Sequence, residues 1–318
     1  MGLTVGVDVG GTKIASGVID EQGQVLHEDQ LPTPDPHGKG VSTAIADAIA
    51  ELVGRHRRLH PVEAVGIGAA GFVDCDRSKV LFAPNIAWRD EPLRDHVADR
   101  VDLPVVVEND ANAAAWAEFC FGAGEDVDDL VLLTVGTGIG GGIVLDGALH
   151  RGAFGVAAEV GHLRVVPGGE RCGCGNRGCW EQYASGRALV REARELIRSG
   201  SPLAGALADA CGGDADAVQG PMVTSLAQAG DRASVELVAE AGRWLGEGMA
   251  SLAAVLDPAV AVVGGGVSAA GDLLLEPMRA AFERELTGRG YRPMLEIRLA
   301  ALGNTAGIVG AGDLARHP

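Results

Sequence analysis

Aromatic and basic residues are scarce in this chain of 318 residues. Phe, Trp and Tyr make up 4% of it, so we expect Ala, Val and Gly to fill the apolar positions and the elements to pack closely. Lysine occurs only at Lys13, Lys39 and Lys79, and the net charge is −17. Because phosphate contacts need clustered Lys and Arg, this charge argues against a surface for nucleic acid or for an anionic membrane.

Secretory and membrane-spanning signals are also lacking. The first residues, "MGLTVGVDVGG", carry neither a basic stretch nor an apolar run that ends in a cleavage site. The most apolar stretch, 249–263, is interrupted by Asp257 and Pro258 and falls short of the roughly 20 residues that a membrane span needs. Three cysteines stand alone, without the paired spacing of a disulfide framework: Cys75, Cys120 and Cys211. We therefore expect a reducing, cytoplasmic location.

The order of the expected elements indicates an α/β protein with a mostly parallel sheet covered on both faces. Strands are expected over 3–10, 14–20, 25–30, 64–71, 104–109, 129–136, 143–147 and 259–266. Helices are expected over 40–58, 92–101, 110–122, 181–199, 233–256 and 305–315, with another that ends near 285. The order strand, glycine turn, strand occurs twice, which suggests an internal duplication and, with the length, two domains. The long aperiodic stretch 152–178 is expected to be a functional loop.

The first glycine turn lies in "DVGGTK". Gly10 and Gly11 let the backbone approach a ligand closely, and successive amides in such a turn can bind an anion. Thr12 and Lys13 add a hydroxyl group and a cation, while Asp8 stands at a strand end, where it can hold a hydrated Mg²⁺. An ordinary hairpin turn explains the paired glycines about equally well.

The second glycine segment is "VGTGIGGG", residues 135–142. Gly136, Gly138 and Gly141 match the spacing of a dinucleotide fingerprint, but a strand follows them where that fingerprint requires a helix. A nicotinamide site is therefore disfavoured, and a second phosphate-binding hairpin accounts better for the same residues. The glycines at 264–266 can let a base or ribose lie against the backbone, although a simple strand-to-helix turn is the alternative.

A carboxylate stands where an expected buried strand meets a helix, in "VVVENDANAAAW". Open α/β sheets gather their ligands at such strand ends. Asp110 can cap the helix, and a cap alone would explain the residue. In a kinase the same carboxylate would accept the proton of an attacking hydroxyl, and Asn109 can hydrogen-bond to neighbouring hydroxyls.

Three cysteines crowd into "RCGCGNRGCWEQ", and their spacing lacks the C-x-x-C pair of redox proteins. Cys172, Cys174 and Cys179 supply three ligands for a structural Zn²⁺, and His162 is the natural fourth. Such a site is closed, so the metal would organise the loop and would not activate water. Glu159 and Glu181 flank these residues in the sequence. They are either solvated surface carboxylates or groups that the metal-bound loop holds side by side along one edge.

Five motifs together resemble the ROK family (repressors, open reading frames and sugar kinases): "DVGGTK", "VENDANAAAW", "GTGIGGG", "AAEVGHLRV" and "CGCGNRGCWEQYASG". The resemblance runs from Gly2 to about Ala315 and is closest to the actinobacterial ATP-dependent glucokinases. It implies the actin-like ATPase (ribonuclease H-like) fold, with two duplicated α/β domains around a cleft. Residues 1–110, completed by a C-terminal helix over 303–318, would form the smaller domain. Residues 111–302 would form the larger domain with the zinc-binding loop.

The resemblance also implies roles for individual residues in transferring the γ-phosphoryl of ATP, with Mg²⁺, to the 6-hydroxyl of glucose. Asp110 would be the catalytic base. The sugar would contact Asn109, Asp110, Glu159, His162 and Glu181, with Asn85 and Gly71 as weaker candidates. The nucleotide would contact Asp8, Gly10, Gly11, Thr12 and Lys13, then Gly136, Thr137, Gly138, Gly140 and Gly141, and finally Gly265. A structural Zn²⁺ would bind His162, Cys172, Cys174 and Cys179, and the second ring nitrogen of His162 would meet a sugar hydroxyl.

Several alternatives stay open at this point. The sugar can be another hexose, such as mannose, N-acetylmannosamine, allose or fructose, and the donor can be polyphosphate in place of ATP. A sugar-responsive transcriptional regulator is disfavoured, because the phosphate loop begins at residue 8 and the net charge is −17. We expect no nucleic-acid or membrane partner, and the family's habit suggests a homodimer or homotetramer.

Overall fold

The computed structural model describes residues 2–316, and the chain divides into two compact units. Unit 1 comprises Met1–Leu132, Gly142–Ala158 and Ala300–Pro318, and unit 2 comprises Leu133–Gly141 and Glu159–Leu299. The division does not fall at residue 110, because helix α3 (Asp110–Phe121) packs along the C-terminal helix α10 (Ala306–Leu314) within unit 1. Positions 317–318 of the expected last helix lie outside the described residues. Among the described helices, none has the length and apolar character that crossing a membrane requires.

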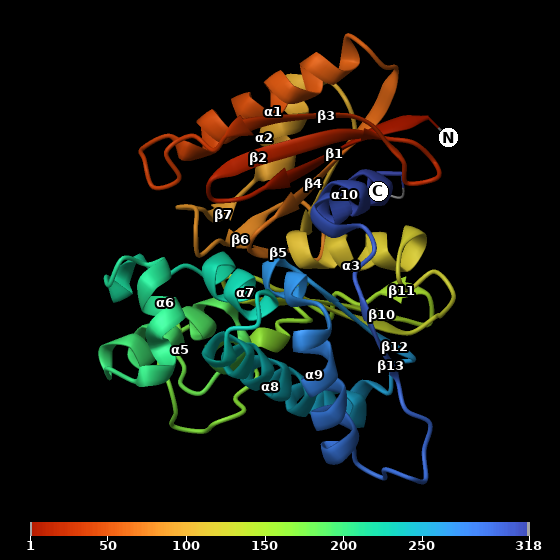
Figure 1. Cartoon of the computed structure of the whole chain (residues 1–318). Helices are drawn as coiled ribbons and strands as arrows, with labels where there is room; N and C mark the ends of the chain where they lie inside the picture. The colour runs from red at the N-terminus through yellow and green to blue at the C-terminus, as the bar shows by residue number, and fades with distance from the viewer. Residues whose placement is uncertain (1, 317–318) are drawn as a thin grey trace. The chain divides into compact units, whose positions relative to one another are not determined.

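A five-stranded sheet with the order β3-β2-β1-β4-β8 forms the centre of unit 1 (Figure 1). Its strands are β1 (Leu3–Val9), β2 (Lys13–Ile19), β3 (Val25–Pro32), β4 (Val62–Ala69) and β8 (Val105–Asn109). β1, β2 and β3 pair as an antiparallel meander, while β4 pairs parallel to both β1 and β8. The expected meander and the parallel crossover strands are confirmed.

Helices cover both faces of this sheet. They are α1 (Val41–Arg57) and α2 (Leu93–Val101) on one face, and α10 with α3 on the other. Val5 and Val7 of β1 point into the core beneath α1. Gly6 faces α10, and a Cβ at Gly6 would lie 1.8 Å from the carbonyl oxygen of Ile308. Backbone therefore packs against backbone, which confirms the close packing that the few aromatic residues led us to expect.

A small three-stranded sheet in unit 1 was not expected from the sequence. It consists of β5 (Phe72–Val73), β6 (Val80–Phe82) and β7 (Arg89–Glu91) in the order β5-β6-β7. Strands of two or three residues are too short to show an alternating pattern, so the sequence carries no signal for them.

The second five-stranded sheet has the order β11-β10-β9-β12-β13. Its strands are β9 (Leu130–Val135), β10 (Ile139–Leu145), β11 (Ala148–Leu149), β12 (Val260–Gly264) and β13 (Glu296–Leu299). β10 begins four residues earlier than expected, so Gly140 and Gly141 lie inside a strand and not in the turn that we assigned to them. The ladder needs only backbone groups, which glycine supplies, and the turn shrinks to residues 136–138.

Unit 2 contains β12, β13 and parts of β9 and β10 of this sheet, and it is otherwise mainly helical. Its helices are α4 (Glu181–Ala184), α5 (Gly186–Arg198), α6 (Gly205–Ala210), α7 (Gly220–Gln228), α8 (Arg232–Leu256) and α9 (Asp272–Glu285). The single helix expected over 181–199 is two helices, because Ser185 is extended and its side chain caps α5 by accepting from the Ala188 N–H. α6 and α7 were not expected. The expected loop 152–178 contains one 3₁₀ turn, η1 (Val160–His162), and is otherwise irregular.

Candidate active site

The first glycine turn of unit 1 joins β1 to β2. The Gly10 N–H donates to the Lys13 carbonyl (3.0 Å), and the Thr33 hydroxyl donates to the Gly10 carbonyl (2.7 Å). Thr12 and Lys13 are exposed. A Cβ at Gly11 would stand 3.4 Å from the Cβ of Asn85, so Asn85 lies beside this turn and is itself exposed. The glycines leave the backbone accessible, as a loop that binds phosphate requires.

Two carboxylates of unit 1 have raised pKa values. Burial and the charge of Asp110 raise the pKa of Asp8 to about 6, and the opposing charge of Lys13 limits the change. Burial also raises the pKa of Asp110, although Asp110 Oδ1 accepts a hydrogen bond from the Ala111 N–H (2.9 Å). A raised pKa makes a carboxylate a stronger base near neutral pH and increases its gain from a bound cation.

Asn109, and not Asp110, caps helix α3. Asn109 Oδ1 accepts from the Asn112 N–H (3.0 Å), and Asn109 Nδ2 donates to the carbonyl of Gly71 (3.0 Å). The alternative that Asp110 is the cap is therefore wrong, because the helix begins one residue earlier than that would require. Asp110 occupies the first helical position, where its carboxylate is not needed as a cap. Gly71 is tied to Asn109 through its carbonyl.

The sequence did not predict a buried ion pair at Glu108, the residue just before Asn109 in β8. Glu108 is 1% exposed; its Oε2 lies 2.5 Å from Arg151 Nε and 3.6 Å from Arg77 Nε. Its Oε1 accepts from the Asn109 N–H and from Asn112 Nδ2, each at 3.0 Å. Burial and the charge of Arg151 lower the pKa of Arg77 to about 10, against the opposing effect of Glu108. The one available signal was a Glu at the end of the apolar run "PVVV".

The second glycine turn, residues 136–138, belongs to unit 2. The Gly136 N–H donates to the Gly138 carbonyl (3.0 Å), and Thr137 is exposed. Gly265 packs on the strand that leads into the turn: its φ is 87°, and a Cβ there would lie 2.6 Å from the Val135 carbonyl oxygen. Only glycine combines that conformation with that approach, so Gly265 is required by the backbone itself.

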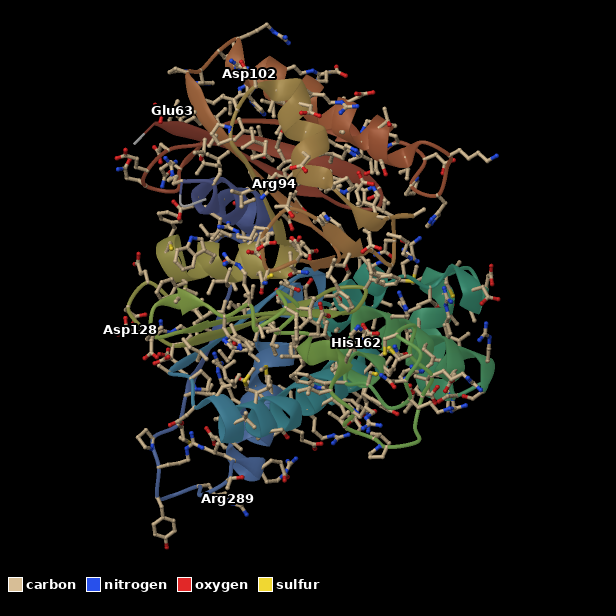
Figure 2. The ribbon with its side chains drawn as sticks, turned by 180° about the vertical axis from the view of Figure 1, so that it is seen from behind. Glu63, Arg94, Asp102, Asp128, His162 and Arg289 are labelled. Atoms are coloured by element: carbon tan, nitrogen blue, oxygen red, sulfur yellow. The ribbon has the colours of Figure 1, made fainter. Side chains whose placement is uncertain are left out.

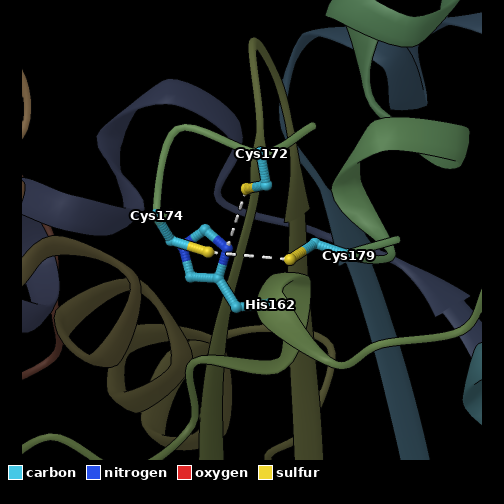
Figure 3. A group of neighbouring side chains, drawn as sticks. All are labelled: His162, Cys172, Cys174 and Cys179. Atoms are coloured by element: carbon cyan, nitrogen blue, oxygen red, sulfur yellow. Dashed lines mark hydrogen bonds between the residues drawn. The ribbon is translucent and has the colours of Figure 1, made fainter. Parts of the chain in front are cut away.

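The three cysteines and the histidine that we grouped from the sequence come together in unit 2. One ligand atom from each of His162, Cys172, Cys174 and Cys179 lies within 4.8 Å of the others. His162 Nδ1 is 3.6 Å from Cys172 Sγ, and Cys174 Sγ is 3.6 Å from Cys179 Sγ (Figure 3). We call these four residues the Cys/His cluster.

The donor set of the Cys/His cluster fits a structural Zn²⁺. Zn–S bonds of about 2.3 Å and a Zn–N bond of about 2.1 Å in a tetrahedron place neighbouring ligand atoms about 3.5 to 3.8 Å apart. Both observed distances of 3.6 Å lie in that range. Gly175 and Gly178 have φ values of 93° and 78°, so glycine is needed for the two turns that bring the sulfurs together.

Two carboxylates flank the Cys/His cluster in unit 2. Glu159 is exposed and precedes η1, and its carbonyl accepts from the His162 N–H (3.1 Å). Glu181 Oε1 accepts from Cys172 Sγ (3.0 Å) and lies 3.9 Å from His162 Nδ1. His162 itself lies in the green part of the ribbon in Figure 2. Of the two carboxylates that we expected beside the cluster, Glu181 contacts it, whereas Glu159 is exposed.

The structure assigns the predicted residues to two groups. Unit 1 carries the first glycine turn, Asp110, Asn109, Asn85 and Gly71; unit 2 carries the second glycine turn, Gly265, Glu159, Glu181 and the Cys/His cluster. The first group contains two carboxylates with raised pKa values and an accessible glycine turn, and the second contains carboxylates, the imidazole of His162 and another glycine turn.

Comparisons with known proteins identify the family of this chain. The model of the ROK family matches residues 4–317. The chain is 52% identical to a glucokinase of Streptomyces coelicolor, over 100% of this chain and 99% of the relative. It is 53% identical to a ROK family glucokinase from Streptomyces griseus crystallised with glucose and AMPPNP, with a TM-score of 0.90 and 100% of both chains covered. The ROK hexokinase of Thermus thermophilus is 40% identical, with a TM-score of 0.79 and coverage of 99% and 98%.

Proposed function

The chain belongs to the ROK family, which has the actin-like ATPase fold, and from this premise we propose that it is an ATP-dependent glucokinase. The reaction transfers the γ-phosphoryl group of ATP to the 6-hydroxyl of glucose and yields glucose 6-phosphate and ADP. The observation that carries the proposal is the full-length similarity, at 53% identity, to a glucokinase that binds both glucose and an ATP analogue.

Asp110 is the proposed catalytic base. As the 6-hydroxyl oxygen attacks the γ-phosphorus, the bond to the leaving oxygen of ADP breaks and the hydroxyl proton passes to the Asp110 carboxylate. The raised pKa of Asp110 supports this role, because it strengthens the carboxylate as a base. Asn109 holds the junction by capping α3, and the N–H of its Nδ2 that is not bonded to Gly71 can still meet a sugar hydroxyl.

The two glycine turns are the proposed phosphate sites. In the first, the amides of Gly11 and Thr12, the Thr12 hydroxyl and the Lys13 ammonium would contact phosphate beside Gly10, whose own N–H holds the turn by donating to the Lys13 carbonyl. In the second, Thr137 and Gly138 would contact phosphate beside Gly136, whose N–H donates to the Gly138 carbonyl, with Gly140 and Gly141 following in β10. Gly265 would leave room for the adenosine. Mg²⁺, when bound, neutralises phosphate charge, and the Asp8 carboxylate would hold it through water. The raised pKa of Asp8 supports this, since a carboxylate that is costly to ionise gains from a cation.

The proposed sugar-binding residues are Asp110, Asn109, Glu159, Glu181 and His162. Asp110 and Asn109 would contact the hydroxyls near C6, and Glu159, Glu181 and Nε2 of His162 the others. His162 Nδ1 points towards Cys172 Sγ, so Nδ1 would bind the metal and Nε2 would remain available to a sugar hydroxyl. Asn85 remains a weaker candidate for the sugar. Gly71 is better explained as the partner of Asn109.

The Cys/His cluster is proposed to hold a structural Zn²⁺ through His162, Cys172, Cys174 and Cys179. Four protein ligands leave no open position, so the ion would stiffen the loop and take no part in the chemistry. Thiolate ligands must stay reduced, which supports a cytoplasmic location. Self-association as a homodimer or homotetramer stays a prediction.

A coupled assay of ADP release, with a panel of hexoses and with ATP or polyphosphate as the donor, tests the proposal. We expect glucose with ATP to give the highest kcat/KM. Higher turnover with mannose, N-acetylmannosamine, allose or fructose would make the protein a kinase of that hexose. Lack of turnover with every aldohexose would overturn the proposal.

A further inference from the structure

The second glycine turn is held from outside by the start of helix α5. The Gly186 N–H donates to the Gly136 carbonyl at 2.8 Å. The first N–H groups of a helix have no partner within the helix, so this one is available to another segment. A carbonyl oxygen that pointed at a phosphate would be repelled by its negative charge. The hydrogen bond from Gly186 keeps the Gly136 carbonyl oxygen turned away from the place where a phosphate would bind.

Gly186 must be glycine for reasons of space. A Cβ there would lie 2.8 Å from the Gly136 carbonyl oxygen and 3.3 Å from Cγ2 of Val267. The φ of Gly186 is not among the positive values, so its backbone conformation is open to any residue. The close approach to Gly136 is therefore the feature that the glycine preserves.

The other end of the same segment contacts the Cys/His cluster. Glu181 Oε1 lies 3.0 Å from Cys172 Sγ. A metal would bind Cys172 as a thiolate, which has no proton to donate, so metal binding changes this contact with Glu181 directly. Glu181 Oε2 lies 2.5 Å from the place that a Cβ on Gly138 would take. One carboxylate thus touches a cluster ligand on one side and the glycine turn on the other.

The segment between these contacts is firmly packed. Ala184 and Ser185 are buried, and the Ser185 hydroxyl accepts from the Ala188 N–H to start α5. Just before the segment, Trp180 is fully buried, and its Nε1–H donates to the Trp244 carbonyl (2.8 Å). The packing leaves this segment little free space in which to absorb a displacement at residue 181 before residue 186.

We propose that residues 181–186 couple the Cys/His cluster to the second glycine turn, and that Gly186 is a positioning residue for the nucleotide phosphates. The metal state of the cluster then sets the affinity for nucleotide as well as the affinity for sugar. This inference rests on the proposed function, in which the turn binds ATP.

The test is the binding of AMPPNP with Mg²⁺ to the metal-loaded Gly186→Ala protein, measured by calorimetry beside glucose binding and metal content. We expect the Kd for AMPPNP to rise at least tenfold, with the Kd for glucose within twofold and the metal content unchanged. Gly205→Ala is the matched control: Gly205 begins α6 as Gly186 begins α5, and nothing lies within 4 Å of its Cβ position. Unchanged AMPPNP affinity in Gly186→Ala, or an equal loss for both ligands, would overturn the inference.

Chelation with 1,10-phenanthroline supplies the second arm. In the unsubstituted protein we expect it to raise the Kd for AMPPNP, whereas in Gly186→Ala it should add less than twofold, because both changes act through one connection. Independent, additive effects would contradict the coupling.

Hydrogen exchange at residues 136–138 needs no substitution and does not depend on nucleotide binding. We expect these amides to exchange faster after chelation, and unchanged exchange would refute the coupling. If the metal-loaded, unsubstituted protein binds no AMPPNP, the proposed function fails, while the exchange result still decides whether the cluster and the turn are coupled.

Discussion

Replacement of Asp8 by Asn should make unit 1 more stable at neutral pH. Burial and the neighbouring charge of Asp110 raise the pKa of Asp8 from 3.8 to about 6. Since each tenfold change in proton affinity is worth about 1.4 kcal/mol, ionising Asp8 in the folded protein costs up to about 3 kcal/mol. Asn has nearly the same shape and carries no charge, so Asp8→Asn removes this cost.

The pH dependence of the effect has a definite sign. Between pH 3.8 and about 6 the folded protein holds a proton on Asp8 that the unfolded chain has released. The free energy of unfolding therefore falls as pH rises through this window. The advantage of Asp8→Asn should be near zero at pH 4, grow through pH 6 and be complete above pH 7.

Native-state hydrogen exchange at the amides of β1 and β4, followed by mass spectrometry without nucleotide or Mg²⁺, measures the stability of this unit. Asp99→Asn on the exposed surface of α2 is the control and should change exchange little. Asp8→Asn should also lose most of its Mg²⁺-dependent turnover, so stability rises while activity falls. The reasoning would be refuted if Asp8→Asn were no more stable than the unsubstituted protein at pH 7.5. It would also be refuted if the variant were still the more stable of the two at pH 4.

Two further predictions concern packing in unit 1. Glu118 is fully buried and accepts hydrogen bonds from three backbone N–H groups, those of Ala123, Ala301 and Leu302. Glu118→Ala leaves these groups without their acceptor, so it should lower the free energy of unfolding, measured with denaturant, by about 3 to 5 kcal/mol. A loss below about 1 kcal/mol would contradict this. Gly310→Ala should also destabilise strongly, since its Cβ would lie 1.7 Å from the Ala113 carbonyl oxygen. Gly54→Ala in α1 is the control, because nothing lies within 4 Å of its Cβ position, and it should raise the free energy of unfolding by up to about 1 kcal/mol. Equal changes in melting temperature for Gly310→Ala and Gly54→Ala would count against the close packing.

Most of the fold could be predicted where one element buries a regular face. The apolar alternation of β1 and the helical spacing in 40–58 were enough to place the meander and α1, and both are confirmed. The break at Ser185 could not be predicted, because helical residues continue on both sides and the break depends on a buried cap and on contact with Gly136. The short strands β5, β6 and β7 also depend on tertiary pairing.

The candidate site was predictable in its residue types but not in its connections. Spacing alone grouped His162 with the three cysteines, and their ligand atoms do lie together. Capping by Asn109 in place of Asp110 depends on where the strand stops, which sequence patterns fix only to within a few residues. The pair of Glu108 with Arg151 joins residues 43 positions apart, and composition carries no trace of such a pairing.

The most direct test of the central claim is the turnover of Asp110→Asn with glucose and ATP, measured beside its affinity for glucose. Asn keeps the size of the side chain but cannot accept the hydroxyl proton. We predict that kcat falls by about 10² to 10⁴-fold while the Kd for glucose stays within a few-fold of the unsubstituted protein. A kcat close to that of the unsubstituted protein would contradict the account.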